Sequence, residues 1–304
     1  MKYTDSVVVV MYVLMWSIQG ILVHRAKRIS NFDASTIVLF QDIVKLTVSC
    51  VLLTREFPGG ISKPLTFNRK SWTLYLVPAG LYGVYNVLTF TALSMFEPSR
   101  YFVLMQARIV VTGVIHGAVM GRRLSVQQWT GLVTVMLGAM LKEYDLLTGR
   151  AAFGSISSVG YAIVGVQILL STTAGVANER LLKTGSVSQN LQNMFMYSWS
   201  IVVDLAIMLL SSQTVSLAAV TADTIPIILN GSAVGLVTSL LLKRLSSVVK
   251  AVASAVELWV TALLSSVVFG YPLTPGSVVG TLVVTAGALI YAIPVALGAS
   301  KKVN

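Results

Sequence analysis

Charged residues are scarce in this chain of 304 residues, where Asp, Glu, Lys and Arg together make up 11%. A soluble domain normally carries about 25%. Hydrophobic residues make up 55% of the chain, and the mean hydropathy is +0.81. Apolar runs of roughly 18 residues or more, the length that a helix needs to cross a bilayer, recur along the sequence. The scarcity of charge excludes an ordinary soluble protein and predicts an all-α, polytopic membrane protein.

Cysteine and histidine are also scarce. Cys50 is the single cysteine, which excludes an intrachain disulfide, and the two histidines, His24 and His116, cannot form a metal site by themselves. The sequence contains no phosphate-binding loop and no Ser-His-Asp set in a suitable context. These absences argue against an enzyme, and they predict neither a metal nor another cofactor.

The apolar runs predict ten membrane-spanning helices joined by short connections. With a cytosolic N-terminus, 13 Lys and Arg residues would face the cytosol and 6 the opposite side. Because positive charge is enriched in cytosolic loops, this distribution predicts that both termini are cytosolic. The net charge of +11 is therefore explained by membrane topology and needs no nucleic acid as partner. The predicted spans are residues 6–23, 34–54, 72–94, 99–120, 126–141, 157–178, 190–211, 225–242, 248–269 and 276–297.

Two segments of the chain repeat each other at an offset of 149 residues. Five helices per copy is an odd number, so the second copy would enter the membrane from the opposite side. We therefore predict two inverted repeats in one membrane domain, residues 1–147 and 148–304. We also expect the matched glycines to allow close helix packing. The competing interpretation is a chance resemblance between glycine-rich helices. The matched pairs include Gly121 and Gly270, Leu124 and Leu273, Gly131 and Gly280, and Gly138 and Gly287.

Several ionisable side chains lie within predicted spans, where each costs about 2.5 kcal/mol or more. Asp42 and Lys45 are three residues apart and can neutralise each other, either as a structural pair or as part of a gate. Asp204 lies near the middle of the seventh span. The remaining three are Arg108, Lys250 and Glu257.

Arg108 and Lys250 are the cations that we expect to bind an anionic substrate. The guanidinium of Arg108 suits two phosphate oxygens, although Glu257, at the equivalent repeat position, could instead be its ion-pair partner. Lys250 either faces the substrate or extends to the membrane surface beside Lys243 and Arg244.

Tyrosine and amide side chains accompany these cations at helical spacings. Such groups suit a nucleobase and ribose through stacking and hydrogen bonds, and we predict that they form one binding cavity. Tyrosines that anchor at the membrane interface are the alternative. The groups that share a predicted helix face are Tyr82 with Asn86, Tyr101 with Arg108 and Thr112, and Asn193 with Tyr197.

The chain resembles, over essentially its whole length, the nucleotide-sugar transporters of the CMP-sialic acid and UDP-galactose/UDP-N-acetylglucosamine type, within the drug/metabolite transporter superfamily. The residues that carry the resemblance include Asp42-x-x-Lys45-Leu46, Arg123-Leu124-Ser125-x-x-Gln128-Trp129, and Glu179-x-x-Leu182-Lys183. The family's lysine in the fourth helix is Arg108 here, and Phe102 replaces a glutamine. Because these departures fall where the substrate would be recognised, the substrate is not copied from any one relative.

The resemblance implies a Golgi or endoplasmic reticulum antiporter, embedded in the bilayer, without ATP or ion coupling. It would exchange a cytosolic pyrimidine nucleotide sugar, a UDP-sugar rather than CMP-sialic acid, for a lumenal nucleoside monophosphate. Tyr82, Asn86 and Tyr197 would contact base and ribose, and Arg108 and Lys250 the phosphates. Asp42, Lys45 and Glu257 would be structural or gating charges, and oligomerisation is left open. The implied site residues are Tyr82, Asn86, Tyr101, Arg108, Thr112, Asn193, Tyr197, Lys250 and Ser254.

Two features leave alternatives open. Lys301 and Lys302 fit a dilysine signal for retrieval to the endoplasmic reticulum, but they also fit the positive flank of a last helix. For function, the rivals are a drug or metabolite exporter without nucleotide specificity and a membrane regulator that transports nothing.

Overall fold

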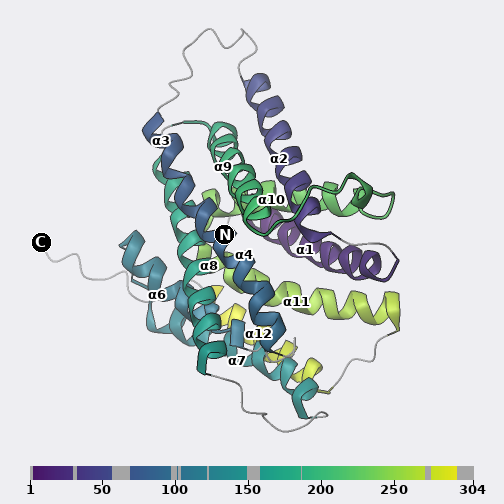
Figure 1. Ribbon diagram of the computed structural model, residues 1–304. Helices are drawn as coiled ribbons and strands as arrows, with labels where there is room; N and C mark the ends of the chain where they lie inside the picture. Colours follow the sequence, from purple (N-terminus) through teal and green to yellow (C-terminus); the bar gives the residue numbers. More distant parts are fainter. Residues whose placement is uncertain are drawn as a thin grey trace, which may run out of the picture.

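The computed structural model of the protein describes residues 3–29, 33–56, 69–96, 101, 104–121, 123–148, 158–185, 187–270 and 275–292; Lys301 and Lys302 lie outside these ranges. All regular structure in the described residues is helical, as predicted (Figure 1). The helices are α1 (Tyr3–Ile29), α2 (Ala34–Glu56), α3 (Arg69–Leu74), α4 (Leu76–Met95), α6 (Arg108–Met120), α7 (Val126–Thr148), α8 (Ser158–Thr184), α9 (Gln189–Leu210), η1 (Leu217–Ala219), α10 (Ile225–Arg244), α11 (Ser247–Phe269) and α12 (Pro275–Ala292).

Six of these helices, namely α1, α2, α8, α9, α10 and α11, are long and apolar enough to cross a membrane. Shorter apolar segments lie in α6, α7 and α12. Each of the ten predicted spans overlaps at least one described helix. The helices therefore agree with a polytopic membrane protein, and ten crossings remain a prediction.

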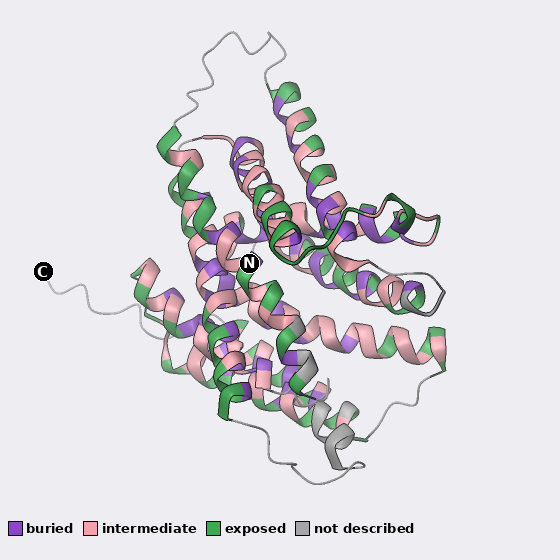
Figure 2. Cartoon of the chain, in the orientation of Figure 1, coloured by how far each residue is buried: buried purple, intermediate pink, exposed green. Residues whose placement is uncertain are grey.

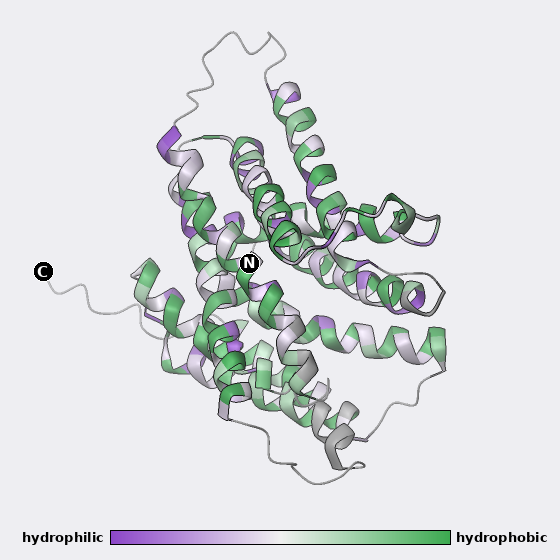
Figure 3. Cartoon of the chain, viewed as in Figure 1, coloured by the Kyte–Doolittle hydropathy of each residue, from purple (hydrophilic) through white to green (hydrophobic). Residues whose placement is uncertain are grey.

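The surface of the helix bundle is apolar and part of its interior is polar. Leu210, Val267 and Leu282 are 87%, 84% and 66% exposed, whereas Gln167 and Glu179 are fully buried. Figures 2 and 3 show the same arrangement, with hydrophobic residues on outward faces of many helices. Large exposed apolar patches mark membrane or protein contacts. This outer surface suits a lipid environment and leaves the polar side chains to gather inside.

Helix α11 lies at the centre of the packing. It runs across the middle of the bundle in Figure 1 and contacts α1, α6, α7, α8, α10 and α12. Around it, α2 packs on α9, α4 on α8, and α1 on α10, while α7 and α12 form the most extensive helix pair. A cavity beside α11 is therefore bordered by helices from both halves of the sequence.

Local sequence signals set the ends of the repeated helices. Gly121 ends α6 and Gly270 ends α11, both in the left-handed conformation with φ of 65° and 71°, which glycine adopts without steric cost. The start of α7 is a capping box. The backbone N–H of Gln128 donates to Ser125 Oγ (3.2 Å), and the backbone N–H of Ser125 donates to Gln128 Oε1 (2.9 Å). The Ser-x-x-Gln part of the family motif thus has a structural role.

The packing of α7 on α12 is reciprocal. A Cβ added at Gly138 would lie 2.7 Å from the Val284 backbone nitrogen, and one added at Gly287 would lie 2.6 Å from the Val135 backbone nitrogen. Residues 138 and 287, like 135 and 284, are separated by the repeat offset. Gly138 of the first repeat meets Val284 of the second, and Val135 of the first meets Gly287 of the second. Such an exchange of equivalent contacts is typical of two units related by a two-fold axis. The expected close packing at these glycines is confirmed.

We predict that Gly138→Val and Gly287→Val each lower the melting temperature in detergent, since overpacking costs typically about 1–3 kcal/mol. Gly165→Ala in α8 is the control, because a Cβ there meets nothing within 4 Å. Equal melting temperatures for all three variants would contradict the backbone contact between α7 and α12.

Candidate functional site

A cavity of about 420 Å³ lies among α1, α4, α6, α8 and α11. It draws its walls from both halves of the sequence, beside the central helix α11. It is large enough for part or all of a small-molecule ligand. The predicted site residues that line it are Tyr82, Asn86, Arg108, Thr112, Lys250 and Ser254, together with Glu257.

Arg108 reaches this cavity because the chain turns immediately before it. Gln106 and Ala107 form a turn, the Ile109 amide donates to the Gln106 carbonyl at 3.0 Å, and α6 begins at Arg108. The helix predicted over 99–120 is therefore interrupted at Gln106 and Ala107. The structure places Tyr101 in an apolar cluster with Phe96 and Met105, and Tyr101 is not among the residues that line the cavity. Broken helices at membrane depth border binding cavities in many transporters.

Lys250 lies in the first turn of α11, which starts at Ser247. Its ammonium nitrogen is 5.9 Å from the centroid of the Tyr82 ring, a cation–π arrangement across the cavity. Beneath it, Ser254 Oγ donates to the Lys250 carbonyl at 3.0 Å and lies 2.9 Å from the Tyr12 hydroxyl. Lys250 thus faces the cavity, and the alternative in which it extends to the membrane surface is wrong.

The electrostatics of the cavity favour an anion. Arg108 and Lys250 both belong to the first turn of their helices, where the helix dipole is positive and disfavours a cation. Both side chains line one cavity, and Glu257 is the acidic residue among those lining it. The Glu257 carboxylate accepts a hydrogen bond from Thr261 Oγ1 at 2.8 Å. The first amides of both helices are already bonded, Ile109 to the Gln106 carbonyl and Ser247 to Glu179, so the cavity offers an anion these two side chains and not open helix N-termini.

Three predicted site residues lie outside this cavity. Tyr101 is 2% exposed within an apolar cluster, and its hydroxyl accepts from Gln167 Nε2 at 3.4 Å. Asn193 Oδ1 accepts from the hydroxyl of Ser239 in α10. Tyr197 has its ring under the Lys45 ammonium, 5.2 Å from the ring centroid. The expectation that α9 contributes to the same cavity is corrected, because its polar face packs against α2 and α10.

The predicted pair of Asp42 and Lys45 forms an ion pair within α2. Asp42 is buried, and its cluster also includes Asp204, whose carboxyl interacts electrostatically with both residues. The cluster lies between α2 and α9, beside Tyr197. Its charges stabilise a helix contact outside the first cavity.

Sequence reasoning missed the contribution of α1 and α8 to the cavity. Tyr12 and Trp16 line it from α1, and Ser171, Thr172 and Gly175 line it from α8. Tyr12 is 2% exposed, so it is a buried tyrosine with its hydroxyl directed at Ser254. Its neighbours from Val7 to Trp16 are apolar, and the polar residues at a helical spacing, Asp5 and Gln19, are seven positions away. A single tyrosine in such a run looks like a core or interface residue.

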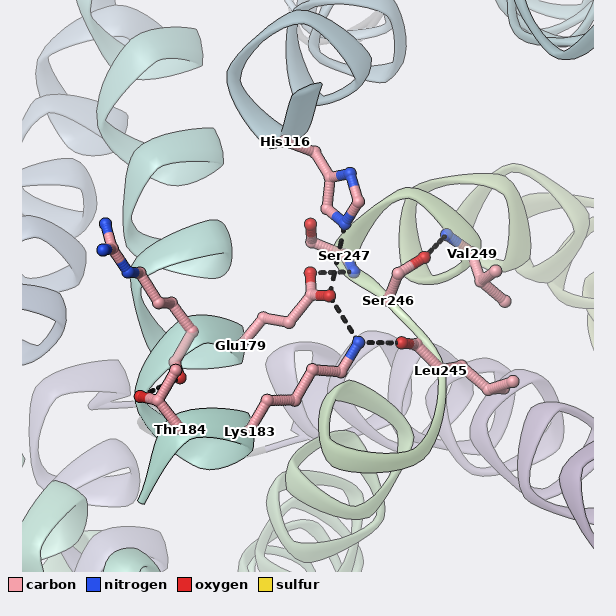
Figure 4. A network of polar contacts seen from close by, with 9 residues as sticks. His116, Glu179, Lys183, Thr184, Leu245, Ser246, Ser247 and Val249 are labelled. Atoms are coloured by element: carbon pink, nitrogen blue, oxygen red, sulfur yellow. Dashed lines mark hydrogen bonds and ion pairs between the residues drawn. The ribbon is translucent and has the colours of Figure 1, made fainter. Parts of the chain in front are cut away.

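A second missed feature is the network around Glu179 (Figure 4). This fully buried carboxylate accepts from the Lys183 ammonium (2.6 Å) and from the Ser247 amide (2.7 Å), and it lies 3.3 Å from His116 Nε2. Lys183 also donates to the Leu245 carbonyl. The network joins α6 and α8 to the turn between α10 and α11. It fixes the start of α11 three residues before Lys250.

Comparisons with known proteins identify the class. The family model described as nucleotide-sugar transporter matches residues 1–292, and the protein belongs to that family. Its relatives are transporters, not enzymes. A UDP-galactose transporter from Drosophila melanogaster, senju, is 30% identical, and the alignment covers 94% of this chain and 85% of that protein. CMP-sialic acid transporter 1 of Oryza sativa subsp. japonica is 25% identical, and the alignment covers 93% of this chain and 92% of that protein.

One further relative and one solved structure are also similar to this chain. The probable UDP-sugar transporter protein SLC35A4 of Danio rerio is 29% identical, over 80% of this chain and 78% of that protein. A solved crystal structure superimposes with a TM-score of 0.74 over 96% of this chain and 98% of the other. Its sequence identity is 12%, so it supports the fold alone.

We predict that Glu179→Gln lowers the melting temperature in detergent. The amide loses the charge-assisted bonds to Lys183 and Ser247, a loss of about 1.5–3 kcal/mol for bonds to charged groups. Glu56→Gln is the matched control, since Glu56 accepts a bond from the Asn190 amide at an exposed position. If the Glu179→Gln protein had the same melting temperature as the wild type, the network would add no stability.

Proposed function

We propose that this protein is an antiporter that exchanges a cytosolic pyrimidine nucleotide sugar for a lumenal nucleoside monophosphate. The observation that carries the proposal is the meeting of Arg108 and Lys250, each in the first turn of its helix, in one cavity that also holds Tyr82. Family membership supplies nucleotide sugars as the substrate class. The higher identity to a UDP-galactose transporter than to a CMP-sialic acid transporter favours a UDP-sugar.

In this proposal, different residues of the cavity contact different parts of the substrate. Arg108 and Lys250 bind the phosphates, because the two cations have few acidic neighbours among the lining residues. The Tyr82 ring and the Asn86 amide contact the base and ribose. The hydroxyls of Thr112 and Ser254 complete the polar wall; both donate to backbone carbonyls and retain lone pairs as acceptors. Tyr101, Asn193 and Tyr197 belong to the supporting scaffold in this proposal.

The proposed mechanism is alternating access by two inverted five-helix repeats, residues 1–147 and 148–304, with ten spans and both termini cytosolic. The reciprocal contact of α7 with α12 supports the two-fold relation between the repeats. Asp42, Lys45 and Glu257 act as structural or gating charges. We place the protein in the Golgi membrane, with cycling to the endoplasmic reticulum through Lys301-Lys302.

The topology can be tested with single cysteines, because Cys50 is the one natural cysteine. In a Cys50→Ser background and in sealed vesicles with the cytosolic face outward, Asn304→Cys should react with a membrane-impermeant maleimide. Gly149→Cys should react only after the vesicles are permeabilised. The reverse pattern would contradict the proposed orientation.

Transport can be tested by counterflow in proteoliposomes preloaded with UMP, CMP or GMP and offered labelled UDP-galactose. We expect uptake with UMP inside. Arg108→Ala and Lys250→Ala should each lower it by about tenfold or more, since loss of one charge-assisted bond costs about 1.5–3 kcal/mol. Arg180→Ala, at an exposed position of α8, is the matched control and should keep wild-type uptake.

Two results would overturn the proposal. Absence of exchange with every nucleoside monophosphate would rule out the antiporter. Transport that survives both Arg108→Ala and Lys250→Ala would favour the exporter alternative, which does not need the two cations.

A further inference from the structure

The polar side chains of the cavity that holds Arg108 and Lys250 differ in the hydrogen bonds they can offer a ligand. The two cations can only donate. Four hydroxyls of the same cavity each donate their one proton to a backbone carbonyl one turn earlier in their own helix. These bonds are Thr112 to Arg108 (2.6 Å), Ser171 to Ile168 (3.3 Å), Thr172 to Ile168 (2.7 Å) and Ser254 to Lys250 (3.0 Å). A ligand therefore meets these hydroxyl oxygens as acceptors.

Tyr12 strengthens this polarity at Ser254. The Tyr12 hydroxyl lies 2.9 Å from Ser254 Oγ. Because Ser254 already donates its proton to the Lys250 carbonyl, the Tyr12 hydroxyl is the donor in this contact. Both protons are then used within the protein. One lone pair of Ser254 Oγ is left, and it suits a ligand group that donates, such as a sugar hydroxyl.

Glu257 continues the acceptor surface along α11. Lys250, Ser254 and Glu257 are spaced by four and three positions, which places them on one face of the helix, and all three line the cavity. At 1.5 Å per residue, Glu257 lies about 10 Å along the helix axis from Lys250. Its carboxylate accepts from Thr261 Oγ1, and a carboxylate has room for more than one donor. The face of α11 thus carries a cation at one end and acceptors at the other.

We propose that Ser254 and Glu257 bind hydroxyls of the sugar of the nucleotide sugar, with Tyr12 as a positioning residue. The surface selects neutral hexoses over sugars that carry a carboxylate. A neutral hexose brings hydroxyl donors to these acceptors while its diphosphate lies at the cations. A carboxylate would bring acceptors to acceptors and a second negative charge to Glu257, which is repulsive.

This inference rests on the proposed function, because it assumes that the phosphates lie at Arg108 and Lys250. It adds a ligand contact to the structural or gating role proposed for Glu257. The cations in the same cavity offset the charge of Glu257, as an acid within an apolar bundle requires. If offsetting Arg108 were its whole role, replacing Glu257 would change the binding of every nucleotide equally, whatever sugar it carries.

The test measures competition in proteoliposomes that exchange labelled UMP for UMP. Unlabelled UDP, UDP-galactose and UDP-glucuronic acid are the competitors, and UDP is the reference because it lacks the sugar. For the wild type we expect UDP-galactose to compete at least about tenfold better than UDP-glucuronic acid, the effect of about one charged interaction. In Glu257→Gln this preference should shrink by about tenfold, because the neutral amide does not repel a carboxylate and can donate to it.

Two further variants keep the test decisive. Glu56→Gln changes an exposed carboxylate of α2 outside the cavity, so this matched control should keep the wild-type preference. Ser254→Ala removes the acceptor oxygen and leaves every charge in place. It should weaken competition by UDP-galactose relative to UDP by about threefold or more, the effect of one neutral hydrogen bond. An unchanged ratio in Ser254→Ala would overturn the sugar site even if Glu257→Gln did not fold.

The outcomes separate this inference from the proposed function. A wild-type protein without any UMP exchange would refute the proposed function. Normal UMP exchange with equal competition by the galactose and glucuronic acid compounds would refute the sugar site alone. A Glu257→Gln protein in which all three competitors change by one common factor would show that Glu257 acts on the cations and does not contact the sugar.

Discussion

The cost of holding charge inside an apolar bundle is the constraint on which this structure depends. Each interior ion needs a partner, a wet cavity or a ligand. Asp42 meets this need with Lys45, and Glu179 with Lys183 and the Ser247 amide. Arg108 and Lys250 are placed differently, since both line one cavity, in which Glu257 is the acidic residue. In the proposed function, an anionic substrate in that cavity offsets their charge.

The Glu179 network is directly connected to the wall of the first cavity. The carboxylate holds the backbone of Ser247, and Ser247 is itself a lining residue at the start of α11. A buried ion pair is seldom the most stable choice for a core. Here it fixes the start of the helix that carries Lys250 relative to α6 and α8, and so sets the separation between Lys250 and Arg108, which line the same cavity.

The fold was predictable because its signals are local. Apolar run length predicted the helices, and the glycine spacing predicted close packing at Gly138 and Gly287, although not which two helices would meet there. The site was predictable where one helix carried the whole pattern, as with Tyr82 and Asn86. Prediction failed where it assumed an uninterrupted helix, as at Gln106 and Ala107, and where a polar helix face had several possible partner helices. The face of α9 that carries Asn193 and Tyr197 is one such case, since spacing within a helix does not specify which neighbour covers it.

The glycine contact between α7 and α12 has a mechanical consequence. At Gly138 and Gly287 the two backbones meet directly, so a small displacement of one helix against the other brings backbone atoms into collision. In the proposed alternating-access mechanism, α7 and α12 would therefore move together, and the motion that opens the cavity would fall on the other helix contacts, around α11 and between α2 and α9.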